Sequence, residues 1–145
     1  MRYNIFLVFI LVGLIVQSQV WSDSLIKAQD FYKNKDFDKS NAIYSKAKVS
    51  SNQEGSLQRE RAQSAYRSDD FDAANAAYEL ALSEEKNVIE QSNILFNQGN
   101  SFIKKGDLEK AINKYKASIL KNPKNKAAKY NLSQALRQKN SQSSS

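Results

Sequence analysis

Three asparagines carry side chains that could hold another polypeptide. Asn97, Asn100 and Asn131 each present an amide that can both donate and accept hydrogen bonds. Such amides can hold the backbone of an extended peptide, which offers donors and acceptors of its own. The alternative is that they hydrogen-bond at helix ends or between neighbouring helices, with no ligand involved.

A set of three cations forms the second candidate. Lys33, Arg67 and Lys104 are separated by 34 and 37 residues, the same offsets at which other residue types recur along the chain. Cations at one helical position could form a ladder that attracts an acidic peptide or a C-terminal carboxylate. The alternative is a set of solvated helix ends, where the helix dipole favours positive charge.

Catalytic chemistry has little support in the sequence. The 145 residues include no cysteine and no histidine, which supply most zinc ligands, thiol nucleophiles and general bases near neutral pH. Asp69, Asp70 and Asp72 gather near Arg67, but carboxylates at a polar helix start are far more often caps than acid–base pairs. The sequence therefore predicts no catalytic residue, no metal ligand and no cofactor.

An internal repeat predicts the elements that position these residues. The chain has only four glycines and one proline, which favours helices over hairpins and tight loops. Asp36, Asp70 and Asp107 recur at short polar breaks and are predicted to cap the second helix of each pair. Small residues recur where the two helices of a pair must approach closely. The expected helices cover about 22–34, 37–50, 56–68, 71–84, 88–105, 108–121 and 124–138.

The N-terminal residues are predicted to be a targeting segment. Residues 5–16 form an uncharged apolar run that follows Arg2, as in a secretory signal peptide. We expect a signal peptide over residues 1–18, cleaved after Ser18, with an uncleaved anchor extending through Trp21 as the alternative. The rest divides into repeats at about 21–54, 55–88 and 92–125 within a domain of residues 19–139, a capping helix at 126–139 and a disordered tail at 140–145.

The third repeat resembles the tetratricopeptide (TPR) signature. Its matching positions are Leu95, Gln98, Gly99, Phe102, Ala111, Tyr115 and Pro123. The resemblance implies an all-α fold, a right-handed α-solenoid of about three helix-turn-helix units with a C-terminal capping helix. It also implies that the first helix of each pair lines a concave groove. On that basis the partner-binding residues are expected to be Lys33, Arg67, Phe96, Asn97, Asn100, Lys104, Tyr130 and Asn131.

The arrangement of the whole chain resembles the BatC-type TPR proteins of bacterial aerotolerance (Bat) operons. That resemblance rests on the apolar start, the degenerate repeats, residues 96–100 and residues 129–132 before a polar tail. It implies a periplasmic scaffold that acts with membrane proteins carrying von Willebrand factor A domains, in tolerance of oxygen or envelope stress. The alternatives are a self-associating spacer, with Trp21, Leu25 and Ile26 in the self-contact, and a membrane-anchored adaptor in an unrelated envelope complex.

Charge is distributed unevenly along the chain. Residues 19–90 carry a net charge of −3, whereas residues 91–145 carry +9, so the third repeat and the cap form a basic end. Such a surface could meet anionic lipid headgroups or an acidic partner. Nucleic acid is the weaker interpretation, because an exported protein rarely meets it and no recognition motif is present.

Overall fold

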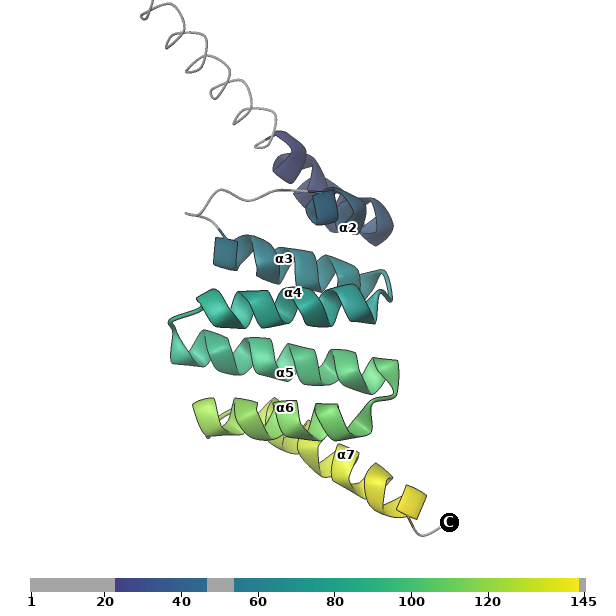
Figure 1. Cartoon of the computed structure of the whole chain (residues 1–145), viewed down its shortest axis with the longest axis vertical. Coiled ribbons are helices and arrows are strands. Elements are labelled where there is room, and N and C mark those ends of the chain that lie inside the picture. The colour runs from purple at the N-terminus through teal and green to yellow at the C-terminus, as the bar shows by residue number, and fades with distance from the viewer. Residues whose placement is uncertain (1–22, 47–53, 144–145) are drawn as a thin grey trace, which may run out of the picture. The chain divides into compact units, whose positions relative to one another are not determined.

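The structure, a computed structural model, describes residues 23–46 and 54–143, and every regular element in these ranges is a helix (Figure 1). The predicted all-α fold is therefore confirmed. The chain divides into two compact units, Met1–Lys48 and Val49–Ser145, which are treated separately below. The predicted signal peptide at 1–18 lies outside the described residues, as do Trp21 and the end of the helix expected at 37–50.

Within its described residues, 23–46, the first unit forms a pair of helices, a helix over residues 23–33 and α2 (Phe37–Lys46). The two helices approach closely because Ala28 and Ser40 are small and completely buried. The Ser40 hydroxyl donates a hydrogen bond to the Ala28 carbonyl at 2.9 Å. The predicted cap of α2 is also present, since the Asp36 carboxylate accepts from the Lys39 amide at 3.3 Å.

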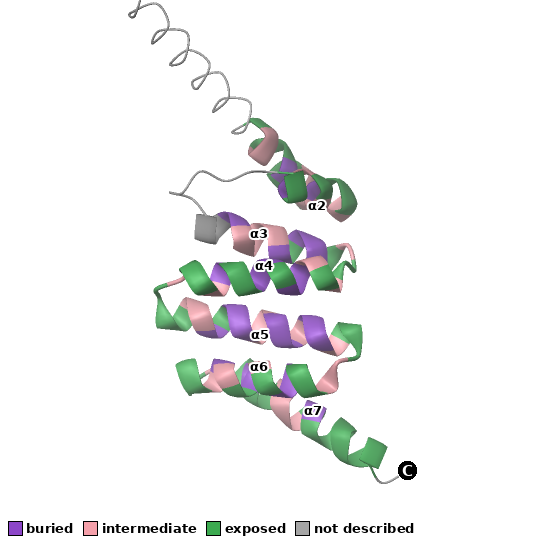
Figure 2. Ribbon diagram, viewed as in Figure 1, coloured by how far each residue is buried: buried purple, intermediate pink, exposed green. Residues whose placement is uncertain are grey.

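The second unit is a stack of helices in which consecutive helices run antiparallel, with α7 inclined to α6 (Figure 1). The ranges predicted at 71–84, 88–105 and 108–121 coincide with three of these helices. Figure 2 shows buried residues along α5, in the middle of the stack, and exposed residues over the second half of α7. The helices are α3 (Glu54–Arg67), α4 (Phe71–Glu84), α5 (Val88–Lys105), α6 (Leu108–Lys121) and α7 (Lys126–Ser143).

Two apolar clusters hold this stack together. The first joins α3, α4 and α5, and the second joins α5, α6 and α7, so α5 contributes to both. Burial of these side chains is the main favourable term for packing the helices. The first cluster contains Ala62, Ala65, Ala74, Ala77, Tyr78, Ala81 and Ile94; the second contains Phe102, Ala111, Ile112, Tyr115 and Ala135.

The predicted caps of α4 and α6 are confirmed. The side chains of Asp70 and Asp107 accept from the backbone amides of Ala73 and Lys110, each at 3.1 Å. Each bond satisfies one of the free amides in the first helical turn.

A residue in the left-handed region precedes each of these capping aspartates. Gly106 has φ 84°, and the residues at the same place in the earlier turns, Lys35 and Asp69, have φ 62° and 59°. The Gly106 amide also donates to the carbonyls of Phe102 and Ile103, which closes α5. The three turns therefore share one backbone conformation built from three different residue types.

The last helix is longer than the sequence predicts. α7 continues to Ser143, although the helix was expected to end near residue 138 and residues 140–145 were expected to be irregular. No glycine or proline follows to stop it. The hydroxyls of Ser141 and Ser143 donate to the carbonyls of Gln138 and Lys139, so these polar residues are accommodated on an exposed helical turn.

A buried polar cluster fixes where α7 begins. The hydroxyls of Ser92 and Ser118, both completely buried, donate to each other's backbone carbonyls at 2.9 and 2.8 Å. The Asn125 amide nitrogen lies 3.3 and 3.2 Å from these two hydroxyl oxygens, and its oxygen accepts from the Ala128 amide at 3.0 Å. Asn125 thus joins the start of α5, the end of α6 and the start of α7.

Replacing Asn125 by alanine is expected to lower the free energy of unfolding by about 3 kcal/mol, the sum of a lost cap and two lost hydrogen bonds. Asn125→Asp keeps the capping oxygen but not the donor, so it should recover at most the capping part of that loss, about 1 kcal/mol. Chemical denaturation of the two variants measures both values. A loss below about 0.5 kcal/mol in the alanine variant would show that the cluster does not hold α7.

Candidate partner-binding site

The predicted residues Asn100 and Asn131 meet where α5, α6 and α7 come together. The Asn100 side-chain oxygen accepts hydrogen bonds from the Tyr115 hydroxyl and from the Asn131 amide, each at 2.8 Å. This is the inter-helix bonding that the sequence left open as the alternative role for these asparagines. Because both bonds go to its oxygen, the NH₂ group of Asn100 is oriented, and it has no partner among the described residues.

Tyr115 on α6 packs beneath the side chains of Asn100 and Phe96 and contacts both. Its side chain is 1% exposed, and its ring lies 6.1 Å from the ring of Phe96, centroid to centroid. Gly99 makes room for it, since a Cβ at that residue would lie only 2.5 Å from Cε1 of Tyr115. The sequence indicated close packing here but missed the role of the hydroxyl. The sequence does hold a signal for that role. The same repeat position is tyrosine in all three units, Tyr44, Tyr78 and Tyr115, although phenylalanine would fill the same space.

The environment of Tyr115 keeps its hydroxyl protonated. Burial raises the pKa of this phenol to about 12, and a hydrogen bond with the Asn131 side chain offsets only part of that rise. A neutral hydroxyl can donate to Asn100, whereas a phenolate cannot. The bond that orients Asn100 is therefore present throughout the physiological pH range.

This pKa predicts how stability depends on alkaline pH. An unfolded tyrosine titrates near pH 10, so between pH 10 and about 12 the folded state binds more protons than the unfolded state. The contribution of Tyr115 is complete below pH 10, and the free energy of unfolding should fall as the pH rises through this window. Tyr115→Phe lacks the titrating group and should show a shallower fall. Urea midpoints from pH 9 to 12 test this, and parallel profiles for the two proteins would contradict it.

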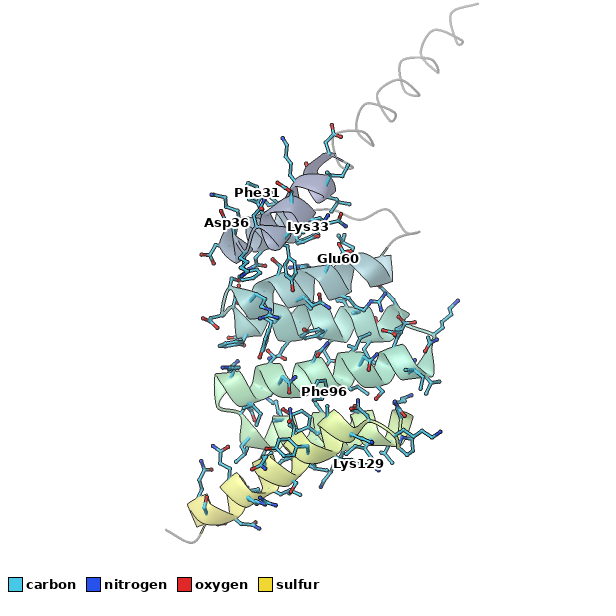
Figure 3. The ribbon with its side chains drawn as sticks, turned by 180° about the vertical axis from the view of Figure 1, so that it is seen from behind. Phe31, Lys33, Asp36, Glu60, Phe96 and Lys129 are labelled. Carbon is cyan, nitrogen blue, oxygen red and sulfur yellow. The ribbon has the colours of Figure 1, made fainter. Side chains whose placement is uncertain are left out.

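The other predicted residues of α5 and α7 lie close to Asn100 and Asn131 along the two helices. Phe96 and Asn97 lie one helical turn before Asn100 and are half-buried, and the Asn97 amide makes no hydrogen bond within the described ranges. Tyr130, beside Asn131 on α7, is 65% exposed. Figure 3 shows Phe96 on α5 and Lys129 on α7 in the same view. We call Phe96, Asn97, Asn100, Tyr130 and Asn131 the α5–α7 surface.

The three predicted cations are divided between the two units, so the described contacts do not test the ladder. Arg67 and Lys104 are exposed in the last turns of α3 and α5, within the second unit. Lys33 is exposed at the end of the helix over residues 23–33, within the first unit (Figure 3). Lys104 has no ion-pair partner in the part of the chain that the structure describes. The proposed ladder therefore stays a prediction.

Other cations of the second unit pair across helices. Lys105 pairs with Asp72, Lys114 with Glu79 and Lys139 with Glu109. Burial acts to raise the pKa of Glu79, but the hydrogen bonds from Lys114 and from the Gln98 amide outweigh it and lower the pKa below its usual value. Glu79 is therefore ionised at neutral pH, and it links α4 to α5 and to α6.

The described residues contain neither a metal-binding cluster nor a membrane-spanning helix. Residues 23–46 and 54–143 contain no group of three or more His, Cys, Asp or Glu side chains that could hold a metal ion. Within the same ranges, none of the helices has the length and apolar character needed to span a bilayer.

Comparison with known proteins shows which family the C-terminal part of the chain resembles. The sequence profile described as "Tetratricopeptide repeat" matches residues 96–143, which include most of α5 and all of α6 and α7. The C-terminal part of the chain is therefore similar to tetratricopeptide repeats. Every residue of the α5–α7 surface lies within this matched segment. No sequence among the curated proteins matches the chain.

Solved TPR domains share the fold. The first TPR domain of Spaghetti (RPAP3), bound to the HSP90 peptide SRMEEVD, has a TM-score of 0.67 and 20% identity, covering 83% of this chain and 93% of that one. The TPR2AB domain of yeast Sti1 in its pHSP90 complex has a TM-score of 0.69 and 20% identity, covering 87% of this chain and 50% of that one. The Sgt2 TPR domain from Aspergillus fumigatus has a TM-score of 0.69 and 16% identity, covering 86% of this chain and 82% of that one. The predicted α-solenoid of TPR helix pairs is confirmed.

Proposed function

We propose that this protein is a non-catalytic TPR scaffold that binds an extended peptide or a partner protein on the α5–α7 surface. The observation that carries the proposal is the orientation of Asn100, whose oxygen is held by Tyr115 and Asn131 while its NH₂ group stays available. Two of the similar TPR structures, those of Spaghetti and yeast Sti1, are described as complexes with an HSP90 peptide or with pHSP90. These complexes support peptide binding by the same fold.

The chemistry of the surface fits a peptide chain. The free NH₂ of Asn100 can donate to a peptide carbonyl without first breaking a bond to the protein, so less ordering is required on binding. Asn97, one turn earlier, can both donate and accept. Tyr130 adds an exposed ring, and aromatic side chains are enriched among residues that dominate binding energy.

Affinity capture with matched variants tests this proposal. The full chain is used as bait on detergent-solubilised envelopes, and bound proteins are identified by mass spectrometry. Tyr130→Ala and Asn97→Ala alter side chains that the fold does not need, and each should weaken capture, about thirtyfold where the residue contributes 2 kcal/mol. Asn93→Ala, also on α5 but outside the surface, is the control. Equal capture by all four proteins would count against the α5–α7 surface.

The predicted cation ladder is tested separately. Lys33→Glu, Arg67→Glu and Lys104→Glu together should reduce capture of an acidic partner, and the loss should shrink as salt is raised. Unchanged capture at low salt would remove the ladder from the proposal and leave the α5–α7 surface in place.

We also propose that the protein is exported to the bacterial periplasm and acts in a Bat-like complex. The apolar run at residues 5–16 and the resemblance to BatC-type proteins support this. The intact mass should give an N-terminus at Gln19 or nearby, whereas a mass that retains Met1 would contradict cleavage. The captured proteins should include membrane proteins with von Willebrand factor A domains. Recovery of this chain alone would favour a self-associating spacer. Recovery of other envelope proteins would favour a membrane-anchored adaptor in an unrelated envelope complex.

A further inference from the structure

The C-terminal part of the chain carries positive charge that no described carboxylate balances. Residues 110–145 contain no aspartate and no glutamate. Lys110, Lys114 and Lys139 pair with carboxylates from earlier in the chain. The other cations of this segment are exposed and form no ion pair with any residue that the structure describes. They are Lys116, Lys121, Lys124, Lys126, Lys129 and Arg137.

Three of these lysines lie within four residues of an exposed leucine. Leu120 is 83% exposed, more than any other large hydrophobic side chain in the described ranges. Lys116 lies four residues earlier on the same face of α6, Lys121 directly follows Leu120, and Lys124 lies just beyond the end of the helix. We call Lys116, Leu120, Lys121 and Lys124 the basic surface.

The preceding helix pair shows that this charge is not a requirement of the fold. An offset of 37 residues places Lys116, Leu120 and Lys121 on Glu79, Ser83 and Glu84 of α4. The same positions thus carry acidic and polar side chains in one pair and basic and apolar side chains in the next. The repeat itself therefore does not account for the lysines of the basic surface.

We propose that the basic surface docks on an anionic lipid bilayer. Lysine is a compact, mobile charge that suits a diffuse anionic surface, whereas arginine suits bidentate binding of a single carboxylate, and all three cations here are lysines. Their aliphatic stems can follow Leu120 toward the acyl chains while the ammonium groups stay among the headgroups. This docking is separate from peptide binding on the α5–α7 surface and does not depend on it.

Vesicle binding tests the charge requirement. The full chain is mixed with vesicles of phosphatidylglycerol and phosphatidylethanolamine, and with neutral phosphatidylcholine vesicles. Because the apolar run at residues 5–16 can enter either vesicle, the measured quantity is the ratio of the two partition coefficients. Each lysine near an anionic surface contributes about a fivefold factor, so Lys116→Gln, Lys121→Gln and Lys124→Gln together should lower the ratio roughly a hundredfold. Lys27→Gln, Lys35→Gln and Lys46→Gln change the net charge equally and should leave the ratio largely unchanged.

A local probe tests whether Leu120 itself meets the membrane. The chain contains no cysteine, so Leu120→Cys can be labelled with an environment-sensitive fluorophore, with Ser83→Cys as the matched position on α4. Anionic vesicles should shift the emission of the label at 120 to shorter wavelength and leave the label at 83 unchanged. Equal shifts at both positions, or none at 120, would overturn the proposal. So would a shift at 120 that appears only with an acidic polypeptide such as polyglutamate, which would assign the surface to a protein partner.

Discussion

Replacing Tyr115 by alanine is expected to lower the free energy of unfolding by about 3–5 kcal/mol, because a large aromatic side chain leaves a cavity in the α5–α6–α7 cluster. The same change removes the hydroxyl that orients Asn100 and the ring packed against Phe96. It should therefore weaken partner capture even at temperatures where the variant is folded. Chemical denaturation measures the first effect, and capture by the folded fraction measures the second.

Tyr115→Phe separates the two contributions. The phenylalanine ring fills the same space, so the loss of stability should be only about 1 kcal/mol, the value of one hydrogen bond. Partner capture should fall nevertheless, since nothing donates to Asn100 from α6. A phenylalanine variant that binds as tightly as the wild type would show that the hydroxyl does not position Asn100.

Gly99→Val is expected to cost about 3 kcal/mol, the upper end of the usual range for overpacking a buried site. A Cβ at residue 99 would approach Cε1 and Cδ1 of Tyr115 to 2.5 and 2.6 Å, well inside normal contact. The ring cannot move away freely, because it is buried and its hydroxyl is hydrogen-bonded to Asn100. The branched valine side chain adds two further methyl groups to that clash.

Two further variants identify the clash as the cause. Asn93→Val, at an exposed position of the same helix, measures the cost of a β-branched residue in α5 and should be below 1 kcal/mol. Gly99→Val combined with Tyr115→Leu should lose less than the sum of the two single losses, because the smaller side chain leaves room. Strict additivity in that double variant would place the cost of Gly99→Val elsewhere.

The fold was predictable because its local signals agree with one another. The repeat offsets located the helix pairs, and Asp70 and Asp107 cap the helices where the sequence placed them. Gly99 was expected to allow close approach, and its contact with Tyr115 shows how. The end of α7 was predicted too early, because polar residues such as Ser141 and Asn140 indicate an irregular tail and yet continue as an exposed helix.

The site was only partly predictable. Their positions in the repeat marked Asn100 and Asn131 as candidate site residues. A sequence cannot show that the amide oxygen of Asn100 would accept from both Tyr115 and Asn131. The cluster of Ser92, Ser118 and Asn125 was missed for the same reason. Its hydrogen bonds join residues up to 33 positions apart, and their geometry depends on the packing of three helices.

The three turns that share a left-handed backbone also define an order of assembly. Gly106 adopts this conformation without steric cost because it has no Cβ. In Lys35 and Asp69 the Cβ crowds the backbone, which costs about 1–2 kcal/mol for an ordinary residue and less for aspartate. In a protein built of repeated helix pairs, each pair forms with its own intrinsic stability. The hairpin of α5 and α6 therefore closes most readily, and we expect folding to start from it and fraying to begin at the N-terminal pair.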